Sequence, residues 1–391
     1  MPLQIYVIGC SQTRTDILDG GSRIFIECAR RWSGLGHKIQ VFTSEEGYKI
    51  FLKYGLLKLS YTVLPPSKHK HLGVYLLYLT RTLSLSTILL KFRPKGENVI
   101  VYSGSDFWPD SLPAWVLKMR FPKIKWVAGF YLFAAQPFTN ASPYKGRRRL
   151  RGLLYYAAQL PVLYLIKKHS DMVWVTNESD RWRFIGNEKL TPEKVVAIRG
   201  GVDCKTPTLV LEPKRKEFDA VFVGRFHPQK GVLELVDIWK RVIQKKKDAK
   251  LAMIGVGELE GKVKMEINEG RLENNITLFG FKDGIEKIQI FKDSRIVLHP
   301  AIYDSGGMAA CEAMACGLPG VSFDLPALKT YYPKGMLKTP CFDLEAFANN
   351  ILKLLNNEGL YKITAKDALD WAKEWDWDKR ADEFLTAIKR A

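Results

Sequence analysis

Short apolar runs rich in β-branched residues alternate along the first half of the chain with amphipathic segments. Residues 3–10 are apolar and β-branched, which predicts a buried strand. Apolar side chains between Ile24 and Leu35 recur at helical spacing, and residues 38–44 form the next predicted strand. Two strands joined by a helix indicate a right-handed βαβ unit and a parallel sheet. Further strand candidates follow at 97–104, 124–130 and 171–177, and residues 195–203 are interpreted as the last strand and exit loop of the first domain.

The same alternation restarts after a charged stretch that contains two prolines. Residues 205–217 have this composition, which is typical of a linker between domains. Residues 218–224 then form a short apolar strand, and residues 231–243 have the periodicity of an amphipathic helix. The chain therefore encodes a second set of strands and helices. Its further strands are predicted at 250–257, 275–281, 295–300 and 319–324.

The chain has 391 residues, which exceeds one ordinary hydrophobic core and suits two domains of roughly 150–200 residues each. The last stretch holds Trp371, Trp375 and Trp377, and a tail this aromatic must be buried. We predict an N-terminal Rossmann-like domain over 1–204, a linker over 205–217, a C-terminal Rossmann-like domain over 218–365, and a terminal helix over 366–391 that packs back on the N-terminal domain.

The balance of charge predicts an anionic partner. Sixty Lys and Arg residues against 41 Asp and Glu give a formal net charge of +19, which attracts phosphorylated ligands, a lipid surface or nucleic acid. Nucleic-acid binding requires basic residues interleaved with stacking aromatics in a recognisable module, and none appears, so we expect no nucleic-acid partner. The six cysteines form no CxxC pair and no zinc spacing, which predicts no metal site and fits a reducing compartment.

One candidate anion site is the stretch 224–231, which follows a predicted strand and precedes a predicted helix. Gly224 permits a tight turn at the carboxyl end of the strand, where parallel sheets bind their ligands. Arg225 offers a planar guanidinium and Lys230 a point charge, and both suit a diphosphate. The alternative is two solvated surface cations in a chain that is rich in them.

A second candidate anion site follows the predicted strand 295–300. A loop of small and polar residues leads there into an apolar helix that Gly317 closes. Two consecutive glycines at a helix N-terminus leave backbone N–H groups pointing one way, which favours a bound anion. The residues concerned are Asp304, Ser305, Gly306, Gly307 and Met308.

Two carboxylates accompany this second site. Asp304 lies in the loop and Glu312 one turn into the helix, in an acid-x7-acid spacing. A carboxylate near a diphosphate makes sense if it binds hydroxyl groups of the sugar or the ribose. The alternative is a capping Asp304 and a solvated Glu312. The neighbours of Glu312 are apolar, however, so its carboxylate needs a partner.

These motifs together resemble those of the retaining GT-B glycosyltransferases of family 4 type, the glycosyl transferases group 1, which include sucrose, glycogen and lipopolysaccharide synthases and phosphatidylinositol mannosyltransferases. The stretch GRFHPQKG at 224–231 is similar to the family's GR-x4-KG, and EAMACGLP at 312–319 matches its E-A-M-A-C-G-x-P closely. RGGVD at 199–203 and GLGHKIQVFTS at 34–44 also look like family segments. The resemblance covers both domains and implies a GT-B fold, in which two Rossmann-like domains with parallel sheets face each other across a cleft.

The resemblance also implies roles for individual residues. Arg225 and Lys230 would bind the donor diphosphate and stabilise the negative charge that develops on it, assisted by backbone N–H groups of the glycine loop. Glu312 would hold the ribose hydroxyls, and Asp304 would contact the transferred sugar. The donor-binding set is then Gly224, Arg225, Lys230, Asp304, Ser305, Gly306, Gly307, Met308 and Glu312, with Gly20 and Gly21 in an N-terminal loop that approaches the phosphate or the acceptor.

Two departures from the family pattern stand out. Asp304 replaces a Glu and is shorter by one methylene, roughly 1.5 Å of reach. The family often has a sugar-contacting His in an N-terminal strand, and residues 126–136 contain none. The resemblance implies a hexosyltransferase-type enzyme that uses a UDP- or GDP-linked sugar, retains the anomeric configuration, and needs neither a metal nor another cofactor. Another GT-B nucleotide-sugar enzyme, an epimerase or a hydrolase, is the alternative.

Basic and apolar residues cluster in two places. Residues 145–151 hold five cations ahead of the apolar, aromatic run 152–166, and residues 68–95 mix cations with tyrosines and leucines. Such segments suit the surface of an anionic membrane, although core helices with solvated basic ends are the alternative. Residues 1–10 lack the features of a signal peptide. We therefore expect a cytoplasmic protein, peripheral on the inner face of the cell membrane, with a glycan or lipid-linked acceptor.

Overall fold

The computed structural model describes residues 2–15, 18–67, 70–139 and 142–390, and the chain divides into two compact α/β units. Lys68, at the start of the basic segment 68–95, lies outside the described residues. The predicted linker 205–217 falls within unit 2. Unit 1 comprises Met1–Ala134, Leu150–Gly200 and Trp377–Ala391, and unit 2 comprises Ala135–Arg149 and Gly201–Asp376.

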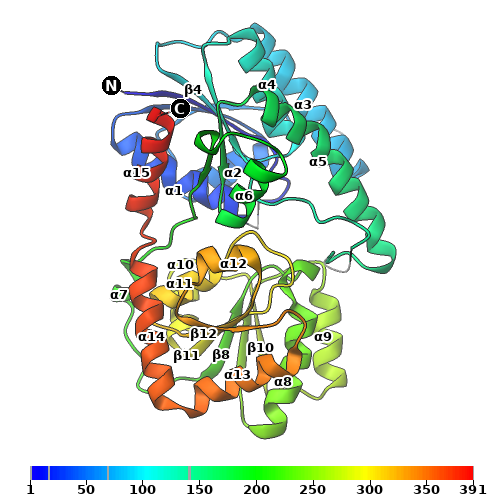
Figure 1. Ribbon diagram of the computed structural model, residues 1–391, viewed down its shortest axis with the longest axis vertical. Coiled ribbons are helices and arrows are strands. Elements are labelled where there is room, and N and C mark those ends of the chain that lie inside the picture. The colour runs from blue at the N-terminus through cyan, green and yellow to red at the C-terminus, as the bar shows by residue number, and fades with distance from the viewer. Residues whose placement is uncertain (1, 16–17, 68–69, 140–141, 391) are drawn as a thin grey trace. The chain divides into compact units, whose positions relative to one another are not determined.

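Unit 1 is built on a sheet of seven strands that are all parallel (Figure 1). The strand order is β3-β2-β1-β4-β5-β6-β7, so the order reverses between β1 and β4. The inner strands of the sheet are short and mostly buried, as expected of a parallel sheet that helices cover on both faces, whereas the edge strands β3 and β7 are more exposed. The strands are β1 (Gln4–Gly9), β2 (Lys38–Thr43), β3 (Ser60–Val63), β4 (Val99–Ser103), β5 (Lys125–Gly129), β6 (Met172–Val175) and β7 (Val195–Ala197).

The helices of unit 1 cover the two faces of this sheet. Buried residues of α3, α4 and α5 share one core cluster with inward residues of the strands, among them Val101. The neighbouring residue Tyr102 points to the other face, where its ring meets Phe384 of α15. The helices are α1 (Gly20–Gly34), α2 (Glu45–Lys53), α3 (Val74–Lys91), α4 (Trp108–Arg120), α5 (Arg149–His169), α6 (Glu178–Gly186) and α15 (Trp377–Arg390).

Helix α15 belongs to unit 1 although it ends the chain. The Phe384 ring stacks on Trp32 of α1, with ring centroids 4.9 Å apart, and also packs against Trp174. The Trp32 indole N–H donates a hydrogen bond of 3.1 Å to the Ala381 carbonyl. Trp371 and Trp375, in contrast, precede Trp377 and lie in unit 2. The tryptophan-rich tail is therefore shared between the two units.

Unit 2 contains a second sheet, of six strands that are all parallel. Its order is β10-β9-β8-β11-β12-β13, which reverses between β8 and β11. In open sheets of this kind, ligands bind outside the carboxyl ends of the two strands at the reversal. The strands are β8 (Phe218–Val223), β9 (Leu251–Ile254), β10 (Ile276–Gly280), β11 (Ser294–His299), β12 (Gly320–Phe323) and β13 (Met336–Thr339).

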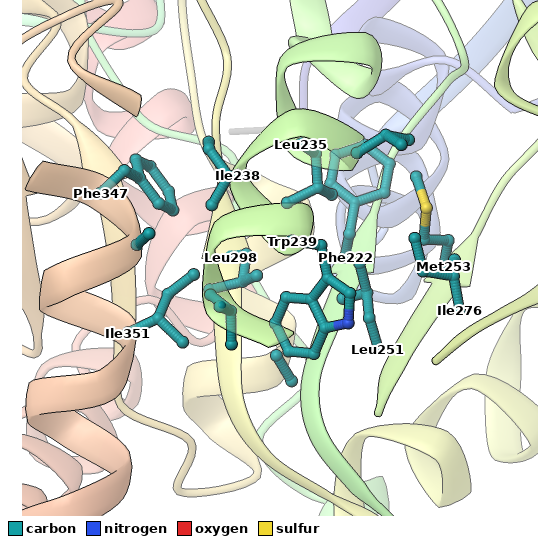
Figure 2. Packing of buried hydrophobic residues seen from close by; sticks show 14 of the residues in the cluster. Phe222, Leu235, Ile238, Trp239, Leu251, Met253, Ile276, Leu298, Phe347 and Ile351 are labelled. Carbon is teal, nitrogen blue, oxygen red and sulfur yellow. The ribbon is translucent and has the colours of Figure 1, made fainter. Parts of the chain in front are cut away.

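The core of unit 2 fixes helix α8 directly behind the first candidate loop. Leu235, Ile238 and Trp239 lie on one face of α8 and are fully buried (Figure 2). They belong to one core cluster with Phe222 of β8 and Phe347 of α13. The helices are α7 (Thr206–Leu209), α8 (Val232–Lys245), α9 (Glu260–Glu269), α10 (Gly284–Lys292), α11 (Met308–Ala315), α12 (Pro326–Tyr331), α13 (Leu344–Asn356) and α14 (Glu358–Lys373).

Candidate donor-binding site

The two candidate loops of unit 2 follow the two strands at the reversal of its sheet. Gly224 comes directly after β8, and the loop from Pro300 to Gly307 comes directly after β11. The backbone N–H of Ile302 in the second loop donates to the Gln229 carbonyl in the first at 2.9 Å. The structure therefore brings together two motifs that lie about 70 residues apart in the sequence, at the place where such sheets bind ligands.

Gly231 shows how closely the two loops approach. Its backbone is left-handed, with φ of 64°, and an added Cβ would lie 1.9 Å from the Pro300 carbonyl oxygen. Both observations require glycine here, because other residues rarely adopt this φ and no side chain fits the space. A short 3-10 turn, Pro228–Lys230, precedes Gly231 and carries Lys230 toward the second loop.

Lys230 pairs with Asp304. Its Nζ lies 2.5 Å from Asp304 Oδ2, and the two side chains are only 21% and 12% exposed. The same carboxylate oxygen lies 3.4 Å from His299 Nε2 at the end of β11. Burial by itself would raise the pKa of the Asp304 carboxyl, but Lys230 and His299 hold it well below its usual value. Burial lowers the pKa of His299, against the opposing effect of Asp304.

Asp304 is also tied to its own loop. Its Oδ1 accepts hydrogen bonds from the backbone N–H groups of Ser305 at 3.0 Å and of Gly306 at 3.4 Å. The carboxylate thus contacts a cation through one oxygen and backbone N–H groups through the other. The Gly306 N–H, expected to assist the donor diphosphate, is turned toward Asp304.

Arg225 has a different environment from Lys230. Its side chain is exposed, and no carboxylate among the described residues pairs with it. Burial, together with Arg225 and Lys230, lowers the pKa of the neighbouring His227 to about 4, so this imidazole is neutral at pH 7. The sequence analysis assigned both Arg225 and Lys230 to the diphosphate. In the structure the Arg225 side chain is exposed and open to an incoming anion, whereas Lys230 already pairs with a carboxylate.

Two tyrosines explain the glycine pair of the second loop. An added Cβ on Gly306 would lie 2.7 Å from the Tyr331 ring, and one on Gly307 would lie 1.7 Å from the Tyr332 hydroxyl oxygen. The Tyr332 hydroxyl donates to the Gly307 carbonyl at 2.6 Å, which fixes the residue before α11. The glycines are therefore needed at least for packing. Nothing in the sequence pattern pointed to Tyr331 or Tyr332.

Glu312 has the partner that its apolar surroundings require. Met308 is the first residue of α11, and Glu312 lies one turn later with its side chain 27% exposed. Lys287 of α10 places its Nζ 2.8 Å from Glu312 Oε2 and 2.9 Å from Asp283 Oδ1. Burial by itself would lower the pKa of Lys287, but the two carboxylates raise this pKa above its usual value. The sequence predicted that a partner exists but not which residue it is.

The N-terminal glycines lie in unit 1, at the start of α1. The Asp19 side chain caps this helix by accepting from the Ser22 N–H at 2.9 Å. An added Cβ on Gly21 would lie 2.9 Å from the Tyr131 ring, so close packing accounts for this glycine. A role of Gly20 and Gly21 toward phosphate or acceptor stays a prediction. Among the described residues no His, Cys, Asp or Glu side chains gather in threes as a metal site requires.

Residues 210–371, which include both loops and both acids, match the family model described as glycosyl transferases group 1. Over these residues the chain is similar to that glycosyltransferase family. The chain is 24% identical to a poly(glycerol-phosphate) alpha-glucosyltransferase of Bacillus subtilis over 48% of its own length and 28% of that protein. It is 27% identical to a phosphatidyl-myo-inositol mannosyltransferase of Mycobacterium leprae, over 42% of this chain and 44% of the relative. The chain thus spans less than half the length of these two relatives.

Solved structures show the fold of the whole chain. Anabaena HepE, crystallised with UDP and glucose, superposes with a TM-score of 0.73 at 14% identity and covers 99% of each chain. At this identity the likeness shows the fold alone. It confirms the expected GT-B class with two Rossmann-like α/β domains, which the seven-stranded and six-stranded parallel sheets display.

Proposed function

We propose that this chain transfers a sugar from a nucleoside diphosphate donor to an acceptor hydroxyl, and that unit 2 holds the donor. The observation that carries the proposal is the exposed guanidinium of Arg225 beside the Lys230–Asp304 pair, in two hydrogen-bonded loops at the reversal of the sheet. The similarity of residues 210–371 to a glycosyltransferase family and the UDP complex of the structural neighbour support this choice.

In the proposed reaction the bond between the anomeric carbon and the diphosphate oxygen breaks, and its electron pair goes to the diphosphate. The acceptor oxygen bonds to the anomeric carbon on the same face, and its proton passes to the departing diphosphate, so configuration is retained. Arg225 and Lys230 stabilise the charge that develops, an effect that typically amounts to about 10²–10³ in rate per contact. The scheme uses no cofactor.

The donor proposal is tested with the full chain. Thermal melting with UDP-, GDP- and ADP-sugars identifies the nucleotide, because binding to the folded state raises the melting temperature. Arg225→Ala should abolish this shift and the transfer of labelled sugar. Arg215→Ala, which removes another exposed arginine from the same unit, should change neither. Release of free sugar or of an epimer without any acceptor product would instead identify the hydrolase or epimerase.

We further propose that one face of unit 1 rests on an anionic membrane and so presents the enzyme to a lipid-linked or membrane-proximal acceptor. Leu76, Leu79, Leu83 and Leu90 follow one another at helical spacing on α3, and all are exposed. The opposite side of α3 is buried in the core cluster. An apolar stripe that faces away from the core is the reverse of an ordinary surface helix, and it needs an apolar environment.

Helix α5 has the same character. Leu150, Leu154 and Tyr164 form an exposed stripe, and the exposed cations Arg151 and Lys168 flank it near its two ends. Both helices pack into the same core cluster, so they cover the same face of the sheet (Figure 1). Each cation near an anionic surface contributes about 1 kcal/mol, and each leucine that enters the interface contributes up to about 2 kcal/mol. No helix among the described residues is long and apolar enough to cross a membrane.

Flotation with liposomes of anionic and of neutral lipids tests this surface. Leu79→Glu with Leu83→Glu should abolish flotation with anionic liposomes. Leu209→Glu with Leu211→Glu, two exposed leucines of unit 2, adds the same charge and should leave it intact. Equal binding by both double variants would refute the assignment, and a change of oligomeric state in the first variant would identify a second copy of the chain as the occupant.

A further inference from the structure

A buried lysine outside both sequence motifs contacts the acid that the motifs single out. Lys287 lies in α10 with only 8% of its surface exposed, and its Nζ bridges Glu312 Oε2 at 2.8 Å and Asp283 Oδ1 at 2.9 Å. A buried ammonium is costly unless it is paired, and here two carboxylates pair it. Asp283 lies at the N-cap position of α10, four residues before Lys287, and its side chain pairs with the lysine instead of with the first backbone N–H groups of the helix.

The contact with Lys287 engages only one of the two carboxylate oxygens of Glu312. Oε2 accepts from Lys287, whereas no group among the described residues hydrogen-bonds to Oε1. The side chain stays 27% exposed, one turn into the helix that starts at the second donor loop. A free glutamate samples several rotamers, but one whose first oxygen is fixed holds the second in place. An ordered, open carboxylate oxygen beside an anion site suits a hydroxyl donor.

We propose that Lys287 is a positioning residue that orients Glu312 toward the ribose hydroxyls and thereby makes the donor site select ribonucleotides over deoxyribonucleotides. The inference rests on the proposed function, because it takes the nucleoside diphosphate to bind at this site. A purely structural role of the Lys287 bridge, joining α10 to α11, is the alternative. The two roles differ in one measurable quantity, the ratio of affinities for the ribose and deoxyribose forms of one nucleotide.

The size of that ratio follows from the hydrogen bond involved. A hydrogen bond to a charged group, lost from an ordered site, corresponds to roughly a 10- to 100-fold change in affinity. We expect the wild-type chain to prefer UDP or GDP over its 2′-deoxy or 3′-deoxy form by at least the lower figure. When Glu312 is no longer held, its hydroxyl contact weakens, and the ratio should fall toward one.

The experiment measures dissociation constants of UDP, GDP and their deoxy forms by calorimetry on the full chain. Lys287→Met removes the charge at nearly constant volume and should abolish the ribose preference, as should Glu312→Gln. Lys287→Arg keeps a cation and should retain most of it. Lys292→Met is the matched control, because Lys292 lies in the same helix, is 7% exposed and pairs with Glu212 at 2.8 Å. This control should melt lower but keep the preference.

The outcomes separate the inference from the proposed function. If no nucleotide binds to the wild-type chain, the proposed function fails. If nucleotides bind but Lys287→Met keeps the wild-type ratio, Lys287 is structural and the inference is wrong while the proposed function stands. Should Lys287→Met not fold, Lys287→Gln, which loses only the charge and some length, replaces it. Loss of the preference in Lys292→Met as well would also overturn the inference.

Discussion

Replacing Arg225 or Lys230 by alanine should abolish transfer in both cases but destabilise the protein in only one. Arg225 is exposed and has no carboxylate partner among the described residues, so its loss leaves nothing uncompensated. Lys230 pairs with Asp304 at 2.5 Å, and its removal leaves a carboxylate that is 12% exposed and that has only the His299 imidazole, whose pKa burial lowers, nearby. We therefore expect Lys230→Ala to lower the stability of the folded protein and Arg225→Ala to leave it nearly unchanged.

The structure sets the magnitude of this difference. Removing one partner of a fully buried pair costs about 3–5 kcal/mol. Lys230 is 21% exposed, and the Ser305 and Gly306 N–H groups still bind Asp304, so we expect a smaller loss, about 2–3 kcal/mol. For a domain of this size that corresponds to a melting temperature about 4–12 °C lower. Arg225→Ala should melt within about 1 °C of the wild type, as surface substitutions do.

A double variant checks the cause. Lys230→Met with Asp304→Asn removes both charges and keeps an oxygen for the loop N–H groups, so it should regain more than half of the lost stability without regaining transfer. The melting temperatures are measured by circular dichroism at pH 7, and transfer of labelled sugar is measured on the same samples. Equal melting temperatures for Arg225→Ala and Lys230→Ala, or a double variant less stable than Lys230→Ala, would refute the reasoning.

Three further predictions concern pH, the glycine loop and the last helix. The pKa of Asp304 is depressed in the folded state. The carboxylate therefore contributes to folding stability above its unfolded pKa of about 3.9, and this contribution is lost as the pH falls. The difference in stability between wild type and Asp304→Asn should accordingly shrink in thermal melts below about pH 4. Tyr332→Phe removes the hydrogen bond to Gly307 and should cost about 0.5–1.5 kcal/mol in denaturant titrations and weaken donor binding, whereas an unchanged donor affinity would make the bond purely structural. Phe384→Ala should cost about 3–5 kcal/mol, and retained protease resistance of the C-terminal segment would contradict the burial of α15 in unit 1.

The strongly periodic parts of the fold could be predicted from the sequence. The predicted strands 3–10, 38–44 and 218–224 overlap β1, β2 and β8, because short runs that are mostly apolar and rich in β-branched residues favour a buried parallel strand. Strand β3 was not predicted, because it has only four residues, SYTV, of which half are polar, and lies at the edge of the sheet. Periodicity also gave no sign that residues 135–149 fold with unit 2 rather than unit 1, since that depends on long-range packing.

The candidate site shows the same difference between features that depend on neighbouring residues and features that depend on long-range packing. Local patterns placed Gly224 directly after a strand and the glycine pair directly before a helix, because turns and helix starts depend on nearby residues. The residues that tie the loops down come from elsewhere in the chain. Lys287 is 25 positions before Glu312, and Tyr332 is 25 positions after Gly307. Neither stands in a motif, so only the three-dimensional structure identifies them.

The replacement of the family's glutamate by Asp304 now has a physical explanation. An aspartate is short enough for Oδ1 to accept from the N–H groups of the two following residues while Oδ2 meets Lys230, an arrangement that resembles a capping turn. A glutamate would place its carboxylate roughly 1.5 Å farther out and could not satisfy both sets of partners at once. Asp304→Glu should therefore release the loop N–H groups toward a bound anion and change donor affinity and sugar preference together. If calorimetry and transfer assays with that variant show the affinity for the nucleoside diphosphate unchanged while only the sugar preference moves, Asp304 acts on the sugar and not through Lys230.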